Sequence, residues 1–208
     1  AAANGAGRWL DIGDRADAAA DAAAAKAAWT MAVQSANAAA PLAERAGAHR
    51  ASLILAANRS AALARLGRFE AAEAGFAEAL RLSHFAVDGT VALRIAENRV
   101  RMLLKQGAVE AAHQLVVSSL AQGESVGAKA PLADLHDRAA EVCEALGDLP
   151  AALQHLRRGA QLRSDVATRR RIAIDLHTTQ TERIHAGRLS ALGQVSAEMV
   201  HEMNQPLG

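Results

Sequence analysis

The sequence predicts an all-α protein, in which stacked helix pairs are followed by one long helix. The 208-residue chain is 51% hydrophobic but only 2% aromatic. Alanine, the strongest helix former, supplies much of that apolar fraction, whereas a β-sandwich or barrel would use more β-branched and aromatic residues. Three glycines recur at a spacing of 40 residues, and no proline occurs between residue 160 and Met203. These observations together favour a helical-repeat fold that ends in a long helix.

Composition excludes several classes of protein. The formal charge of +1, from 23 basic and 22 acidic residues, gives no overall attraction to nucleic acid or to an anionic membrane. The single cysteine, Cys143, excludes an internal disulfide framework and a thiolate zinc site. No apolar run approaches the roughly 18 to 20 residues of a membrane span, and the first ten residues lack the basic start of a signal peptide. We therefore expect a cytoplasmic location, with no nucleic-acid partner and no membrane segment in this chain.

The sequence is also expected to be an excerpt of a longer protein. It starts without an initiator Met, and it stops inside what reads as a motif, HEMNQPLG. Membrane segments elsewhere in that longer protein are left open.

Residues 48–160 carry a repeat of 40 residues. The segments LGRFEAA, QGAVEAA and LGDLPAA align around Gly67, Gly107 and Gly147. Each glycine is expected to end a helix, because glycine adopts the left-handed conformation without strain. Since a single helical hairpin cannot bury its own apolar face, we predict three antiparallel helix pairs that stack on one another.

Two other positions of the repeat are predicted to pack between the helices. Two residues after the glycine stands a large apolar residue, which should wedge between the helices: Phe69, Val109 and Leu149. Three positions later a small residue lets the two backbones approach: Ala72, Ala112 and Ala152. Cys143 occupies the slot of Leu63 and Leu103 and is therefore predicted to be a core residue.

The repeat resembles the second half of the tetratricopeptide repeat. The matching residues are Gly67, Phe69, Ala72, Phe76 and Ala79. The tryptophan and glycine of that family's first helix are absent, and the period is 40 rather than about 34 residues, as in the longer-helix variants of bacterial regulators. The resemblance implies a helical-repeat solenoid that binds a protein or peptide.

Residues 1–47 are predicted to form a degenerate N-terminal repeat. Forty residues before Gly67 stands Ala27, and Trp29, Ala32 and Ala36 follow in the register of the later repeats. Trp29 is expected in the core, with a groove-facing aromatic anchor as the alternative.

Residues 161–185 are predicted to form a linker helix. Between residues 157 and 188, eight arginines stand against three acidic residues, an excess of five positive charges. A nucleic-acid patch would interleave aromatic residues with these charges, so a solvated helix face is the favoured interpretation.

The next helical segment is predicted to pair with its copy in a homodimer. A coiled-coil-like seam steps by three and four residues over two heptads: Leu189, Leu192, Ser196, Met199 and Met203. One heptad upstream stand Glu182 and His185, so the phase is lost there, which indicates a stutter or break in a signalling-type helix.

Residues 186–208 carry the most specific motif. RLSALGQ followed by VHEMNQPL resembles the first helix of the dimerisation and phosphoacceptor domain of bacterial sensor histidine kinases. The resemblance is to the subgroup with an H-E-hydrophobic-N-Q-P-L box, and it breaks off just past that box. It implies that His201 is the phosphoacceptor and Glu202 its acid/base partner. Gln205 takes the position that orients water or the partner's phosphoryl group.

The chemistry of phosphoryl transfer fits these residue types. The reaction needs a nucleophile in line with the γ-phosphate, and a neutral imidazole is one near pH 7. A neighbouring carboxylate can fix the tautomer of the ring and stabilise its cation. Gln205 lies one helical turn beyond His201, and Pro206 should kink the helix there. A zinc-protease motif of the H-E-x-x-H type fails, because Gln205 stands where the second histidine would be.

The favoured function is therefore the sensory and linker region of a two-component sensor histidine kinase, in which the repeats bind a protein or peptide signal. A response regulator would receive the phosphoryl group. No cofactor or metal is expected in this chain, and the other seven histidines show no ligand spacing. ATP and Mg are expected for a catalytic domain that these residues lack, so whether the chain is itself an enzyme stays open.

The alternative is a non-enzymatic tetratricopeptide-like interaction scaffold with a dimerising C-terminal helix. The residues after Gly208 in the longer protein would discriminate the two hypotheses. A second helix and an ATP-binding α/β domain would decide for the kinase. A third hypothesis, small-molecule binding in the repeat groove, has no convergent polar cluster in the sequence to support it.

Overall fold

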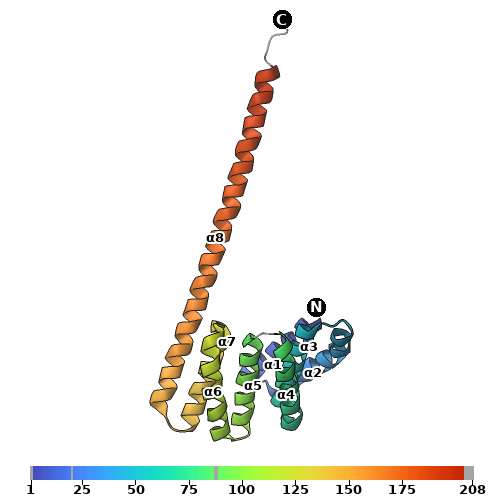
Figure 1. Cartoon of the computed structure of the whole chain (residues 1–208), viewed down its shortest axis with the longest axis vertical. Coiled ribbons are helices and arrows are strands. Elements are labelled where there is room, and N and C mark those ends of the chain that lie inside the picture. Colours follow the sequence, from blue (N-terminus) through green and yellow to red (C-terminus); the bar gives the residue numbers. More distant parts are fainter. Residues whose placement is uncertain (1, 20, 87–88, 204–208) are drawn as a thin grey trace. The chain divides into compact units, whose positions relative to one another are not determined.

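The structure, a computed structural model, describes residues 2–19, 21–86 and 89–203, and for residues 2–4, 84–86, 179, 181 and 183–203 it describes the backbone alone. These residues form eight α-helices and no strand (Figure 1). The helices are α1 (Ala2–Ala18), α2 (Ala22–Arg45), α3 (His49–Arg65), α4 (Phe69–Ala86), α5 (Gly89–Lys105), α6 (Val109–Val126), α7 (Lys129–Ala145) and α8 (Leu149–Met203). The predicted all-α helical-repeat fold is confirmed. The chain divides into two units, residues 1–163 and 164–208.

The helix bounds repeat in steps of 40 residues. The first helices of the pairs, α3, α5 and α7, begin at residues 49, 89 and 129, and the second helices, α4, α6 and α8, begin at 69, 109 and 149. The turns within the pairs centre on Gly67, Gly107 and Gly147, with φ angles of 75°, 74° and 81°. The left-handed glycine turns the next backbone N–H back onto the helix it ends. Arg68 N–H thus donates to the Leu63 carbonyl at 2.9 Å, and Asp148 N–H to that of Cys143 at 2.8 Å.

Two further left-handed glycines lie between helix pairs. Gly47 and Gly127 have φ angles of 63° and 69°; Gly47 follows α2 after Ala46, and Gly127 comes directly after α6. These two glycines are two 40-residue periods apart, so the sequence contains a second glycine position of the repeat. The predicted turns used the other position alone, that of Gly67, Gly107 and Gly147. The corresponding position of the middle repeat is residue 87, which lies outside the described residues.

The small residues of the repeat are buried as predicted. Ala72 and Ala112 are fully buried and Ala152 is 3% exposed. Phe69 and Val109 pack against the core clusters of their repeats. The prediction for Leu149 is wrong, because its side chain is 66% exposed. A further helix pair comes after α4 and after α6 and covers their outer sides, whereas no pair comes after α8 in the part of the chain that the structure describes.

The N-terminal hairpin differs from the predicted register. Ala27 lies inside α2, and the turn falls between α1 and α2 instead. The Asp21 carboxylate accepts a hydrogen bond from Ala24 N–H at 3.0 Å and so caps α2. The helix begins at residue 22 rather than 29, which adds about two turns of 3.6 residues. Because two whole turns preserve the helical phase, Trp29 and the alanines in its register remain buried.

Trp29 lies in the core, as predicted, with 6% of its surface exposed. Its ring N–H donates to Asp14 Oδ1 at 3.1 Å. Gly13 of α1 lies directly against the ring, since a Cβ at this position would come within 2.4 Å of it. The tryptophan therefore joins α1 to α2 and does not serve as an exposed anchor.

An ion-pair network joins α1 to the first helices of the repeats. The Arg65 side chain, 4% exposed, donates Nε and Nη2 to the two carboxylate oxygens of Asp14 at 2.9 and 3.0 Å. Its Nη1 donates to Asn98 Oδ1 of α5 at 2.9 Å. Burial raises the pKa of Asp14, but Arg65, Arg101 and Trp29 together outweigh it, so the pKa is lowered overall. The carboxylate therefore stays charged and holds α1 against the stack.

Replacing Ala112 by Leu should destabilise the fold. Ala112 is fully buried where α6 crosses its neighbours, and overpacking a core costs about 1 to 3 kcal/mol. Thermal and urea unfolding would measure the loss. Ala111→Leu is the matched control, because Ala111 is the exposed neighbour on the same helix. Equal stability of the two variants would contradict the placement of Ala112.

Candidate functional site

The predicted phosphoacceptor box begins in the last turn of a helix. α8 ends at Met203, so the backbone at His201 and Glu202 is helical. Gln205 and Pro206 lie outside the described residues. The assigned roles of His201, Glu202 and Gln205 therefore still rest on the sequence motif.

The helix that carries this box is continuous. α8 extends from Leu149 to Met203 without a break, so its first turns belong to the last repeat pair. The helical backbone also continues through Glu182 and His185, where the apolar phase is lost. Of the two predicted alternatives, a break is therefore wrong, while a stutter remains, because a stutter shifts the side-chain phase without interrupting the backbone hydrogen bonds. By helical geometry the seam positions from Leu189 to Met203 share one face.

A second candidate site lies between the second helices of consecutive repeats, where a groove recurs with the 40-residue register. We call the space bounded by α2, α3 and α4 groove 1 and that bounded by α4, α5 and α6 groove 2. For the register-equivalent positions of α6, α7 and α8, where the register alone defines the place, we use the name groove 3. Seven residues that line groove 1 are Ala40, Ser52, Leu55, Ala56, Arg59, Glu78 and Leu82. Their register equivalents all line groove 2: Leu80, Ala92, Ile95, Ala96, Arg99, Ser118 and Gln122. The repeat therefore builds the same groove twice from corresponding positions.

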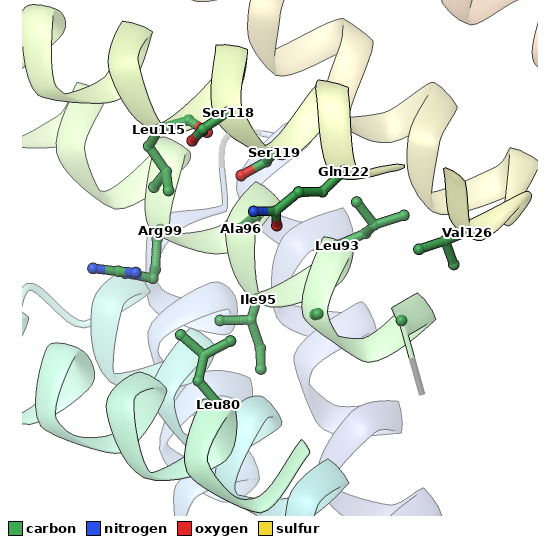
Figure 2. Close-up of a pocket in the computed structure, with 12 residues that line it drawn as sticks. Leu80, Leu93, Ile95, Ala96, Arg99, Leu115, Ser118, Ser119, Gln122 and Val126 are labelled. Carbon is green, nitrogen blue, oxygen red and sulfur yellow. The ribbon is translucent and has the colours of Figure 1, made fainter. Parts of the chain in front are cut away.

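Groove 2 is the larger of the two. It holds a cavity of about 410 Å³, compared with about 90 Å³ in groove 1. Figure 2 shows Ser119 and Gln122 of α6 facing Ala96 of α5, with Leu80 of α4 beside Ile95. Glu78 of groove 1 is replaced by the shorter Ser118, which accounts for part of the extra space.

Two of the polar side chains that line groove 2, those of Arg99 and Ser118, are engaged within the protein. Arg99 donates Nε to Glu73 Oε2 of α4 at 3.1 Å, and its Nη2 donates to the other carboxylate oxygen. The Ser118 hydroxyl donates to the Leu115 carbonyl at 3.0 Å. The cavity is thus walled mainly by apolar side chains, with Ser119 and Gln122 as uncharged polar groups and an arginine whose charge is balanced. It suits an apolar side chain of a partner better than a charged small molecule.

Groove 3 brings together two histidines that the sequence did not link. His136 of α7 and His155 of α8 lie with their Nδ1 atoms 3.0 Å apart. They occupy the register positions of Ala96 and Leu115, which line groove 2. The sequence spacing did not predict this contact, because the two residues are 19 positions apart on different helices. The signal that could have paired them is the 40-residue register, which matches His136 to Ala96 and His155 to Leu115, two residues that line groove 2.

The remaining candidates carry no reactive site. Cys143 is 6% exposed and lies in a core cluster, as predicted. Burial, with a smaller contribution from Asp148, raises the pKa of its thiol, so the residue is a poor nucleophile. Within the described ranges, no group of three or more His, Cys, Asp or Glu residues could hold a metal ion. Among those residues, too, no helix combines the length and apolar character needed to cross a membrane.

Comparisons of this chain with known protein families and with curated protein sequences find no match.

Proposed function

We propose that this chain is the sensory and linker region of a two-component sensor histidine kinase, with His201 as the phosphoacceptor. The observation that carries the proposal is the sequence His201-Glu202-Met203-Asn204-Gln205-Pro206-Leu207 at the end of a helix that starts in the repeats. A change in the packing of the repeats would act on the first turns of that same helix.

The repeats supply the input in this proposal. A protein or peptide partner would place an apolar side chain in groove 2, whose cavity of about 410 Å³ is within the range of ligand-binding pockets. Arg99 belongs to α5 and its ion-pair partner Glu73 to α4, so a ligand in this groove would contact two consecutive repeats. Binding there would favour one arrangement of the stack over others.

The output is phosphoryl transfer on His201. A nitrogen of the imidazole forms a bond to the γ-phosphorus of ATP while the bond from that phosphorus to the bridging oxygen of ADP breaks. Glu202 would accept a hydrogen bond from the ring and stabilise the cation that forms. The phosphoryl group then passes to an aspartate of a response regulator. ATP and Mg would be bound by a separate catalytic domain, and the chain would act in the cytoplasm as a homodimer through its C-terminal helix.

The second candidate function is a non-enzymatic interaction scaffold. The observation that favours it is groove 2, whose mainly apolar cavity could bind a partner without any phosphoryl transfer. In this case the C-terminal helix would only dimerise the chain.

Radiolabelled ATP separates the two candidates. The 208 residues alone, incubated with γ-labelled ATP and Mg, should stay unlabelled, since they contain no glycine-rich phosphate loop. Adding the ATP-binding domain of the longer protein should produce an acid-labile, base-stable label on this chain. If the chain stays unlabelled while that domain binds ATP, the scaffold is supported and the kinase proposal is wrong.

A further inference from the structure

Groove 3 contains a pair of histidines at the place where α8 leaves the repeats. In groove 2 the same two positions hold Ala96 and Leu115, which line a cavity. In groove 3, His136 is 7% exposed and His155 is half-buried, with ring centroids 5.2 Å apart. The last repeat has therefore replaced an apolar contact by a direct contact between two titratable rings.

The histidine pair lies among the contacts that hold α8 against α7. On one side, Cys143 of α7 clusters with Ala152 of α8. On the other side, Leu132 clusters with Leu162. Beyond these clusters, Arg163 donates to both carboxylate oxygens of Asp137, at 2.7 and 3.1 Å. Any change that separates the two rings must therefore disturb the packing of α8 on α7.

The geometry of the pair fixes its protonation. Two nitrogens 3.0 Å apart form a hydrogen bond only if one carries a proton and the other does not. The Nε2 atom of His136 is buried without a hydrogen-bond partner, and a buried N–H without an acceptor is rarer than a buried bare acceptor. His136 is therefore assigned as the Nδ1–H tautomer that donates to His155. His155 accepts at Nδ1 and carries its own proton on Nε2.

A first proton can be added only at a cost to this arrangement, and a second proton removes the hydrogen bond. A proton on His155 Nδ1 would face the Nδ1–H of His136 across 3.0 Å. If His136 instead moved its proton to Nε2, that N–H would be buried without an acceptor. A second proton on the pair would add the repulsion of two like charges. The singly protonated pair therefore keeps its hydrogen bond only where His136 Nε2–H is tolerated without an acceptor or reaches water, and the doubly protonated pair requires the rings to separate.

We propose that the His136–His155 pair is a pH-sensitive contact that holds α8 on α7 when both rings are neutral and releases it when they are protonated. The proposal concerns the packing of the last repeat, so it does not depend on whether the chain belongs to a histidine kinase.

The charges around the pair do not cancel its preference for neutral rings. Burial lowers the pKa of His136 most, and His155 and Arg158 of α8 lower it further. Glu124 of α6 and Asp137 of α7 act in the opposite direction but leave the pKa lowered. The pKa of His155 is also lowered, first by burial and then by His113 of α6. Because both rings resist protonation in the fold, the contact is complete above the ordinary histidine pKa of about 6.5 and weakens as the pH falls below it.

Cys143 gives a direct readout of this contact. It is the single cysteine of the chain and is buried between α7 and α8. Its rate of reaction with 4,4′-dithiodipyridine, divided by the rate for the urea-unfolded chain at the same pH, measures how often the two helices separate. For the wild-type chain we expect this ratio to rise severalfold between about pH 7.5 and pH 5.5, on either side of the ordinary histidine pKa.

Two variants and a control decide the outcome. His155→Gln keeps an oxygen that can accept from His136 and removes one titration, and His136→Ala with His155→Leu copies the residues of groove 2. We expect the rise in the Cys143 ratio to be smaller in His155→Gln, where His136 still titrates, and to be nearly absent in the double variant. His49→Gln, a histidine at the exposed start of α3, should keep the wild-type response. A wild-type ratio independent of pH, or an unchanged rise in both variants, would overturn the proposal.

Nuclear magnetic resonance of the wild-type rings provides a test that needs no variant. Long-range ¹⁵N–¹H spectra should show His136 protonated at Nδ1 and His155 at Nε2, with both titration midpoints below the ordinary histidine pKa of about 6.5. Midpoints at that ordinary value for both rings would refute the pair.

Discussion

Replacing His201 by Gln should abolish phosphorylation of the longer protein that the motif implies. Glutamine cannot form the nitrogen–phosphorus bond, so no acid-labile, base-stable label should appear from γ-labelled ATP. Glu202→Gln should slow labelling by roughly 10²- to 10⁴-fold without abolishing it, because that is the usual contribution of a positioned acid or base. The initial rate of label incorporation at saturating ATP measures both effects.

His185→Gln is the control for the His201 variant. It removes another histidine of α8 and should leave the rate of labelling unchanged. All three variants should unfold at the wild-type temperature, since none replaces a residue of the repeats. Undiminished label in the His201 variant would rule out this residue as the phosphoacceptor, and equal losses in the His201 and His185 variants would point to damage of the helix.

Replacing Phe76 by Ala should have the largest effect on stability. Phe76 is fully buried, in the core cluster that α4 shares with α5, and truncating a buried phenylalanine to alanine costs about 3 to 5 kcal/mol. The free energy of unfolding in urea should fall by that amount. The loss combines the apolar surface returned to water with the cavity left behind.

Leu156 offers a control at the corresponding position of the last repeat. It stands two 40-residue periods after Phe76 but is 41% exposed, so Leu156→Ala should cost less than about 1 kcal/mol. Similar losses for the two variants would mean that burial does not depend on the position of a repeat in the stack.

The period of the fold, the turns at Gly67, Gly107 and Gly147 and the burial of the small residues could be predicted from the amino-acid sequence. These features depend on local rules, such as the left-handed glycine at Gly67 and the need for a small side chain where Ala112 meets its neighbours. Cys143 was also placed in the core through its slot in the repeat, and the fold confirms it. The phosphoacceptor box is likewise a linear pattern of adjacent residues, which is why the functional proposal rests on the sequence motif around His201.

Tertiary packing sets which copies of each position are buried and which distant residues meet. The register gives Leu149 the same role as Phe69, yet Leu149 is exposed because no helix pair of the described residues covers it. The turn before α2 lies two helical turns from its predicted position, a displacement that preserves the apolar phase and therefore leaves no trace in the periodicity. His136 and His155 are unrelated in sequence and meet only because α7 and α8 pack side by side. A repeating sequence defines the local environment within each repeat. Contacts between repeats depend on how many repeats stack and in which order, so the tertiary structure alone decides which residues of different repeats meet.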